Sequence, residues 1–243
     1  MALTDHDTIS GLAEAYATGE ACGVRVVPGV EISASFEREV HLLGYFFDPD
    51  NAELLDTLET ARTHRIERVY EICNRLSRMG AVVDPTAILK SADGNVGRPH
   101  IARALVESGH ARDLDHAFDR FIGNDSPAYV PASPLTIRDA ISLIHRAGGI
   151  TSIAHPGVDR ISQRLGELKA LGLDAVEIRH PGHNPGMRAK LVSLAATLNL
   201  GTTGGSDLHH PESANLMGHS GIDLESLRRL EQRAEARREM EAT

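Results

Sequence analysis

The sequence predicts an α/β fold, a largely parallel sheet or barrel that carries a helical insert. Short apolar runs rich in β-branched residues alternate with helical patterns, as they do in successive βα units. Between about Ala52 and Pro131, by contrast, helical periodicity dominates and no buried strand is evident. We therefore expect a barrel domain made of residues 1–51 and 132–243, and a helical cap subdomain made of residues 52–131.

The amino-terminal part reads as one helix followed by two strands. The helix is expected over Ile9–Cys22, and Gly23 is suited to end it because glycine adopts the left-handed conformation of a helix C-terminus without strain. Apolar residues then predict strands at Val24–Val30 and Glu39–Phe47.

The helical region begins with a long amphipathic pattern over Asn51–Met79, which Gly80 ends. Shorter helices are expected at Pro99–Ser108 and Leu114–Phe121. The charged residues on their outer faces are most simply solvent-exposed.

Alternation of helices and strands resumes at Ile137. The sequence predicts helices at 137–147, 165–171, 187–198 and 224–240, and strands at Ile150–Ala154, Ala175–Ile178 and Gly201–Gly204.

Composition limits the partners. The chain has 243 residues, of which 41% are hydrophobic, enough to bury one substantial core. Its formal net charge is −9, so it lacks the basic surface that duplex DNA or another long nucleic acid requires. A small phosphorylated ligand is compatible with this charge. No apolar run reaches membrane-spanning length, and we expect no membrane partner.

The two cysteines, Cys22 and Cys73, match no metal-ligand or redox spacing. We expect both to be buried packing residues, and their isolation favours the reducing cytoplasm as the compartment.

Histidine is the feature that points to chemistry. The chain has 13 His residues, more than its 5 Phe and 4 Tyr together, and His is the commonest metal ligand in proteins. Polar and ionisable residues fall just past predicted strand ends, where parallel α/β folds gather their functional loops. These clusters are Thr4–Asp7, Glu31, His41, His155–Gly157 and Gly205–His209.

Imidazoles together with carboxylates suit Zn, Mn or Fe, and carboxylates can bridge two ions. Such ions lower the pKa of bound water toward neutrality, which removes the need for a Ser or Cys nucleophile. A single His at a strand end is more often a hydrogen-bonded structural residue. Five such clusters in succession favour a multinuclear metal site instead.

The motifs together resemble the polymerase and histidinol phosphatase (PHP) superfamily of metal-dependent phosphoesterases. They are Leu-Thr-Asp-His-Asp-Thr at 3–8, Gly-Val-Glu-Ile-Ser at 29–33, His-Leu-Leu-Gly at 41–44, Ala-His-Pro-Gly at 154–157 and Gly-Ser-Asp-Leu-His at 205–209. The resemblance covers essentially the whole chain. Within the superfamily it is greatest to the phosphatases and exonucleases that act on nucleoside 3′,5′-bisphosphates or short 5′-phosphorylated RNA.

The resemblance implies a distorted seven-stranded β/α barrel with up to three divalent metal ions. Glu31 would bridge two ions, and His41 and His155 would complete the set for one of them. Asp207 would join Glu31 on a second ion, and His6 and His209 would serve a third. Asp207 and His209 would thus act in catalysis through bound metals.

The chain departs from the superfamily pattern at its amino end. The Asp-Leu-His-x-His-Ser segment of the first strand, and a further Asp after it, are absent. One strand and one helix, about 30 residues, would be missing from the barrel. Because an incomplete barrel exposes strand edges, we expect the natural product to be longer.

Three residues are expected on the substrate side. Arg98 and His100 open a helix next to Pro99, where a guanidinium and a helix amino terminus suit phosphate binding. His180 follows a strand end and is expected to contact the sugar or leaving group. Nearby Glu177 either pairs with Arg179 or supports the ligands from behind.

The leading hypothesis is hydrolysis of a phosphate ester on a nucleoside 3′,5′-bisphosphate or short 5′-phosphorylated RNA, with metal-bound hydroxide as the nucleophile. Two alternatives stay open. One is a histidinol-phosphate phosphatase, which the insert and the Gly-Val-Glu-Ile-Ser motif disfavour. The other is a catalytically impaired remnant that binds metal or nucleotide without turnover.

Overall fold

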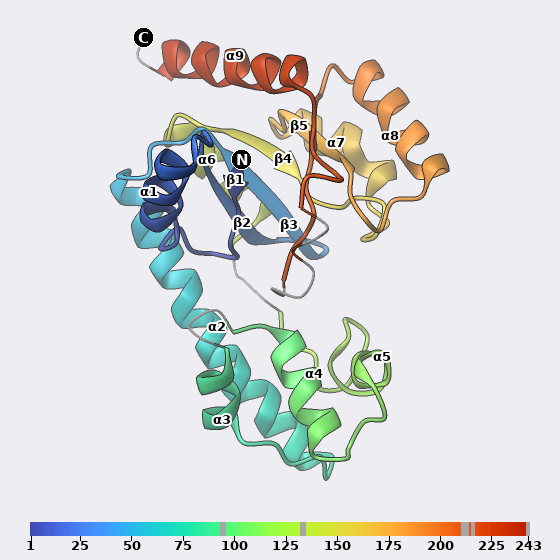
Figure 1. The fold of residues 1–243 in the computed structure, drawn as a ribbon. Coiled ribbons are helices and arrows are strands. Elements are labelled where there is room, and N and C mark those ends of the chain that lie inside the picture. The colour runs from blue at the N-terminus through green and yellow to red at the C-terminus, as the bar shows by residue number, and fades with distance from the viewer. Residues whose placement is uncertain (93–95, 132–134, 210–213, 215–216, 242–243) are drawn as a thin grey trace. The chain divides into compact units, whose positions relative to one another are not determined.

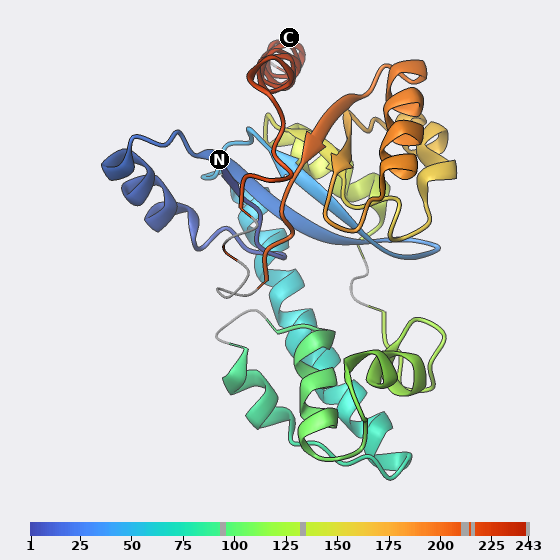
Figure 2. The same cartoon turned by 45° about the vertical axis from the view of Figure 1, so that its right-hand side comes forward.

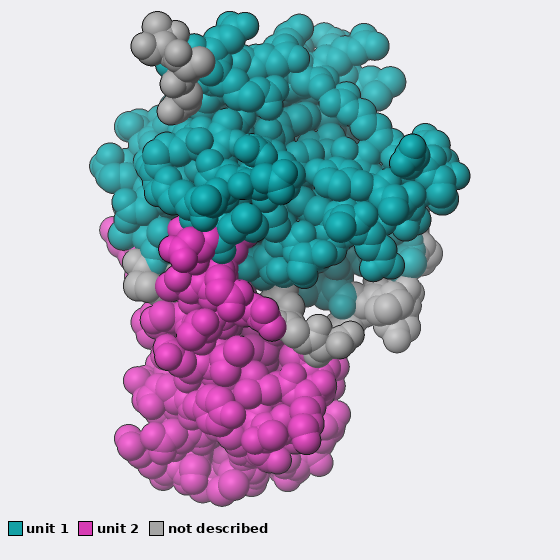
Figure 3. Space-filling view, turned by 90° about the vertical axis from the view of Figure 1, so that its left-hand side faces the viewer, with its two compact units in different colours: residues 1–34, 40–55, 135–243 teal, residues 35–39, 56–134 magenta. Residues whose placement is uncertain are grey.

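The computed structural model describes residues 1–92, 96–131, 135–209, 214 and 217–241. These residues form two compact units (Figure 3). The first unit comprises Met1–Ala34, Val40–Leu55 and Leu135–Thr243. The second comprises Ser35–Glu39 and Asp56–Pro134. Each unit is described by itself below.

A six-stranded sheet is the centre of the fold (Figure 1). Its strands lie side by side in chain order, β1 (Ala2–Leu3), β2 (Val27–Phe36), β3 (Arg38–Tyr45), β4 (Ile150–Ile153), β5 (Ala175–Arg179) and β6 (Gly201–Gly204). The β1–β2, β4–β5 and β5–β6 pairs are parallel, whereas β3 and β4 are antiparallel. The sheet curls in the manner of a half-barrel (Figure 2). A mixed α/β fold is therefore confirmed, and a seven-stranded barrel stays a prediction.

Five α-helices accompany the sheet among the described residues of the first unit: α1 (Leu12–Cys22), α6 (Ile137–Arg146), α7 (Leu165–Ala170), α8 (Pro185–Thr197) and α9 (Leu224–Glu241). A short 3-10 helix at Ser162–Arg164 comes directly before α7. Side-chain caps fix where two of them start. Thr136 accepts the Asp139 amide at the start of α6, and Asn184 accepts the Met187 amide at the start of α8.

Several boundaries differ from the sequence predictions. Helix α1 starts at Leu12 rather than Ile9, and β2 starts at Val27 rather than Val24 and continues to Phe36. Pairing with β1 begins at Val27, which explains the late start of β2. Cys73 is buried as expected, but Cys22 is exposed because it lies in the last turn of α1.

The second unit is helical. It contains most of α2 (Ala52–Arg78), then α3 (Pro85–Ser91), α4 (Arg98–Glu107), α5 (Leu114–Ala117) and a π-helical turn (Phe118–Ile122). Residues from α2, α3 and α4 share one apolar core, which includes Leu76, Ile88 and Leu105. Helix α3 was not predicted from the sequence, although Asp84 caps it and a proline at its first position favours a helix start. Within the described residues, no helix combines the length and apolar character needed to cross a membrane.

Candidate metal centre

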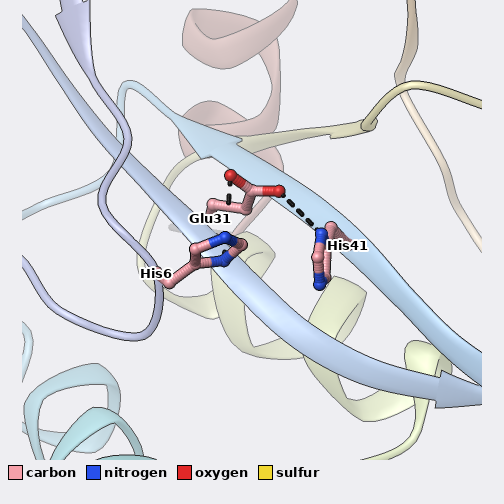
Figure 4. A group of neighbouring side chains, drawn as sticks. All are labelled: His6, Glu31 and His41. Carbon is pink, nitrogen blue, oxygen red and sulfur yellow. Dashed lines mark ion pairs between the residues drawn. The ribbon is translucent and has the colours of Figure 1, made fainter. Parts of the chain in front are cut away.

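Glu31 lies at the middle of the site. It is inside β2 rather than past a strand end, because β2 extends beyond the predicted Val30, and it is 6% exposed. The chain after β1 continues alongside it, since Glu31 donates its amide to the Asp5 carbonyl and the Asp7 amide donates to the Glu31 carbonyl. This pairing brings His6 opposite Glu31, with Nδ1 3.8 Å from Oε2 (Figure 4).

His41 and His155 approach the other oxygen of Glu31. His41 lies inside β3, also in a strand interior, and its Nδ1 is 3.0 Å from Glu31 Oε1 (Figure 4). His155 follows β4 by two residues, and its Nε2 is 3.5 Å from the same oxygen. The two imidazole nitrogens are 3.3 Å apart, although the residues are 114 positions apart in sequence. One oxygen and two nitrogens therefore form a small triangle.

The triangle fits a metal ion. A tetrahedral ion with bonds of about 2.1 Å separates its ligand atoms by about 3.4 Å, close to the three distances observed. Glu31 Oε1 is buried, and within the part of the chain that the structure describes it has no hydrogen-bond partner of good geometry. A buried acceptor without such a bond is costly unless another group satisfies it. Among the described residues, one group of side chains has its potential ligand atoms close enough together to hold a metal ion, and it consists of His6, Glu31 and His41.

The ionisation of Glu31 and His155 depends on the charged residues around them. Burial opposes ionisation of Glu31, but His155, His41 and His6 hold the pKa of its carboxyl well below the ordinary value. Burial lowers the pKa of His155, yet Asp159 and Glu31 outweigh it and raise that pKa to about 11. Glu31 is thus an anion, and a proton on His155 competes with any metal ion for Nε2.

Asp207 lies next to His180 and His209. Its Oδ2 is 3.3 Å from His180 Nε2, and its Oδ1 is 3.6 Å from His209 Nδ1. Burial opposes ionisation of Asp207, but His180 and His209 keep the pKa of the carboxyl below its ordinary value. The Gly182 amide donates to His180 Nδ1, so a neutral ring carries its proton on Nε2, facing Asp207.

Ring contacts join these groups to the Glu31 cluster. The His209 ring lies 5.8 Å from that of His6, and the His180 ring 5.5 Å from that of His155. The structure therefore brings together seven of the predicted site residues in the first unit, namely His6, Glu31, His41, His155, His180, Asp207 and His209. Which of them bind metal and which bind substrate stays a prediction.

Two further carboxylates lie beside the predicted ligands. Asp159 Oδ2 lies 3.0 Å from His155 Nδ1, a contact that the spacing of four residues in a turn makes possible. Asp7, in a left-handed conformation, accepts the Ser33 amide at 2.8 Å and ties the His6 segment to β2. For Asp159 and Asp7 alike, the only signal in the sequence was that a carboxylate stands within a few residues of a candidate metal ligand.

Arg98 and His100 belong to the second unit and are held by contacts there. The Arg98 guanidinium donates to Asn124, lies 3.4 Å from Glu39, and lies about equally close to the rings of Phe118 and Tyr129. The Gly97 amide donates to His100 Nδ1, which supports the start of α4. A phosphate contact by Arg98 would be made by an already ordered guanidinium.

Sequence comparison finds relatives whose names describe hydrolases. A 5′-3′ exoribonuclease from Haemophilus influenzae is 35% identical over 217 residues, which cover 87% of this chain and 79% of the relative. A 3′,5′-nucleoside bisphosphate phosphatase from Chromobacterium violaceum is 33% identical over 236 residues, which cover 90% and 80%. No protein-family model matches the chain.

Solved structures agree with these relatives. A protein from Bifidobacterium adolescentis assigned as a metal-dependent phosphoesterase superposes with a TM-score of 0.81 at 32% identity, covering 94% of this chain and 84% of that one. An amidohydrolase from Chromobacterium violaceum, solved with bound sulfate and no metal, superposes with a TM-score of 0.82 at 31% identity, covering 97% and 85%.

Proposed function

Because the chain belongs to the family of 5′-3′ exoribonucleases and 3′,5′-nucleoside bisphosphate phosphatases, which are phosphoesterases, we propose that it removes a phosphate from a small nucleotide or short 5′-phosphorylated RNA. The chain is a metal-dependent phosphatase or phosphodiesterase, as the sequence predicted. The finer proposal concerns its substrate and the residues that act on it.

The observation that carries the proposal is the triangle of Glu31 Oε1, His41 Nδ1 and His155 Nε2, with sides of 3.0, 3.3 and 3.5 Å. A divalent ion such as Mn, Zn or Fe held by Glu31, His41 and His155 would supply Lewis-acid activation of water and of the phosphoryl oxygens.

The proposed ligands are His6, Glu31, His41, His155, Asp207 and His209. Glu31 lies between the imidazoles of His6 on one oxygen and His41 on the other, so its two oxygens suit two ions. Asp207 and His209 lie on the loop after β6 and would complete the remaining positions, up to three ions. The ionised state of both carboxylates favours cation binding.

Substrate contacts are proposed for His180, Arg98 and His100. A neutral His180 with its proton on Nε2 can donate to a phosphate or leaving-group oxygen when Asp207 turns to a metal ion. Arg98 offers a fork of N–H donors that is already oriented by Asn124 and Glu39. His100 supports the same helix start.

Metal removal and substrate comparison test the proposal together. Protein dialysed against EDTA is assayed for phosphate release from adenosine 3′,5′-bisphosphate, from a short 5′-phosphorylated RNA and from histidinol phosphate, with and without Mn²⁺. We expect activity only with metal, and on the two nucleotide substrates. Activity that survives the chelator contradicts metal dependence.

The competing functions give different patterns in the same assay. Preference for histidinol phosphate would favour the other phosphatase branch. Nucleotide binding with bound metal but no turnover would identify a non-catalytic remnant. Either result would overturn the proposed substrate or activity.

A further inference from the structure

Two buried side chains of the first unit have no part in the proposed ligand set. Glu177 lies near the end of β5, and His183 lies in the loop before α8; they are 4% and 2% exposed. A buried carboxyl and a buried imidazole are costly unless hydrogen bonds satisfy them. Both of them bond to the turn that carries His155.

Glu177 holds the backbone of that turn. The His155 amide donates to Glu177 Oε2 at 2.8 Å. His155 has a φ of 27°, in the left-handed region that a residue with a Cβ adopts only when its surroundings impose it. A bond to the amide of this same residue is well placed to impose that conformation.

The other oxygen of Glu177 faces a second loop. A Cβ added at Gly205 would lie 3.2 Å from Glu177 Oε1. Gly205 begins the segment that leads to Asp207 and follows β6 directly. The Glu177 carboxylate therefore lies between the two loops that carry His155 and Asp207.

His183 supports the turn two residues further on. The Gly157 amide donates to His183 Nε2 at 3.1 Å, so the ring proton is on Nδ1, which donates to the Ile178 carbonyl at 3.0 Å. Both ring nitrogens are thus used within the protein, and His183 is not a ligand. A Cβ at Gly157 would lie 2.8 Å from the His183 ring, so the turn packs directly on it.

We propose that Glu177 is a positioning residue that holds the His155 turn in its metal-binding conformation, with His183 supporting the same turn through Gly157. Asp159 Oδ2 lies 3.0 Å from Nδ1 of the His155 ring, and Glu177 accepts the His155 amide. Nε2 then points at Glu31 before any ion arrives. This inference rests on the proposed metal-dependent function, because it assigns residues that preorganise the same site.

Metal affinity of the metal-free protein tests the inference apart from turnover. Mn²⁺ binding is measured by titration calorimetry for the wild-type chain, Glu177→Ala, Glu177→Gln and His183→Phe. We expect Glu177→Ala and His183→Phe to weaken binding about 10- to 100-fold, the range for residues that orient metal ligands. Glu177→Gln keeps a side-chain carbonyl at the same position and is expected to stay within about threefold of wild type.

Glu225→Ala is the matched control, because Glu225 is exposed and its ion pair with Arg229 lies along its own helix, α9. Circular dichroism and thermal unfolding of each metal-free variant establish that it is folded. Wild-type affinity in folded Glu177→Ala overturns the inference, and so does an equal loss in Glu177→Gln, since that variant retains the acceptor. If Glu177→Ala does not fold, the Mn²⁺ affinities of Glu177→Gln and His183→Phe decide the outcome. Wild-type Mn²⁺ affinity in His183→Phe then overturns the inference.

The two proposals fail in different ways. A wild-type chain that binds no Mn²⁺ contradicts the proposed function and removes the basis for the inference. A wild-type chain that binds Mn²⁺ and hydrolyses nucleotides, with Glu177→Ala indistinguishable from it, contradicts the inference alone.

Discussion

Glu31 in the first unit is buried and Glu39 in the second has a side chain only 9% exposed, but the partners of these two carboxylates differ. Glu31 faces the imidazoles of His6, His41 and His155, whereas Glu39 is bound by Arg68 at 2.8 Å with Arg98 at 3.4 Å. An imidazole can release its proton and accept a metal ion, and a guanidinium cannot.

This difference distinguishes a candidate metal-binding site from a structural ion pair. The positive charge beside Glu31 can come from two sources, either a proton on an imidazole or a bound divalent ion. Around Glu39 the positive charge is fixed, because both of its charged partners are guanidiniums. The low exposure of the carboxylate explains why two guanidiniums gather around it. Arg68 also donates to the Val130 carbonyl. Substitutions in the two environments test this contrast.

Replacing Glu31 by Ala removes the carboxylate that all three imidazoles face. We expect Mn²⁺ affinity and phosphate release to fall by more than about 100-fold, beyond the loss seen when only an orienting residue is changed. Metal content after gel filtration measures the first effect. A Glu31→Ala chain that retains wild-type metal content would show that the triangle is not the binding site.

Replacing Glu39 by Gln removes the fixed partner of Arg68 and Arg98. Breaking a buried ion pair from one side costs about 3–5 kcal/mol, because the remaining charges stay buried without compensation. Urea unfolding followed by circular dichroism measures the loss of stability. Mn²⁺ affinity is expected to stay within about twofold, and a large loss of affinity without loss of stability would contradict the contrast.

Replacing Asp174 by Asn tests a buried carboxylate that is paired with both an imidazole and a guanidinium. Asp174 contacts His145 at 2.7 Å, accepts from Thr151 and pairs with Arg237 on α9. Hydrogen bonds to a charged group contribute about 1.5–3 kcal/mol, so we expect a loss of about 2 kcal/mol at neutral pH.

The pH dependence of stability gives the second readout for Asp174. Burial opposes its ionisation, but His145, Thr151 and Arg237 hold the pKa below the ordinary 3.8. Its contribution to stability is therefore full above about pH 4 and is lost as the pH falls through the lowered pKa of the folded state. Asp174→Asn should lack this acidic decline, and an identical decline in both proteins would exclude Asp174 as its source.

Replacing Arg98 by Lys gives the smallest effect. Lysine keeps the positive charge near Glu39 but loses the planar fork, so we expect KM for adenosine 3′,5′-bisphosphate to rise about tenfold, or about 1.4 kcal/mol, with kcat little changed. Exposed Arg112→Lys is the control. An unchanged KM for Arg98→Lys would assign Arg98 to structure alone.

Much of the secondary structure followed from local patterns. The strand Gly201–Gly204 was predicted with its observed bounds, and α2, α4 and α6 within one residue at each end. The strand that carries Glu31 was placed less well. It was predicted to end at Val30, because the polar Glu31 interrupts the apolar pattern, but the hydrogen-bonded strand continues to Phe36.

The sequence by itself determined the alternation of helices and strands, the helical character of the second unit and the identity of the residues that gather in the first. Those properties depend on side-chain type and on short-range periodicity, which are local. The tertiary structure decided that His6 lies opposite Glu31 through the chain that follows β1, and that Glu177 of β5 accepts the amide of His155. These arrangements depend on strand register and on backbone hydrogen bonds between distant segments, which no local pattern encodes.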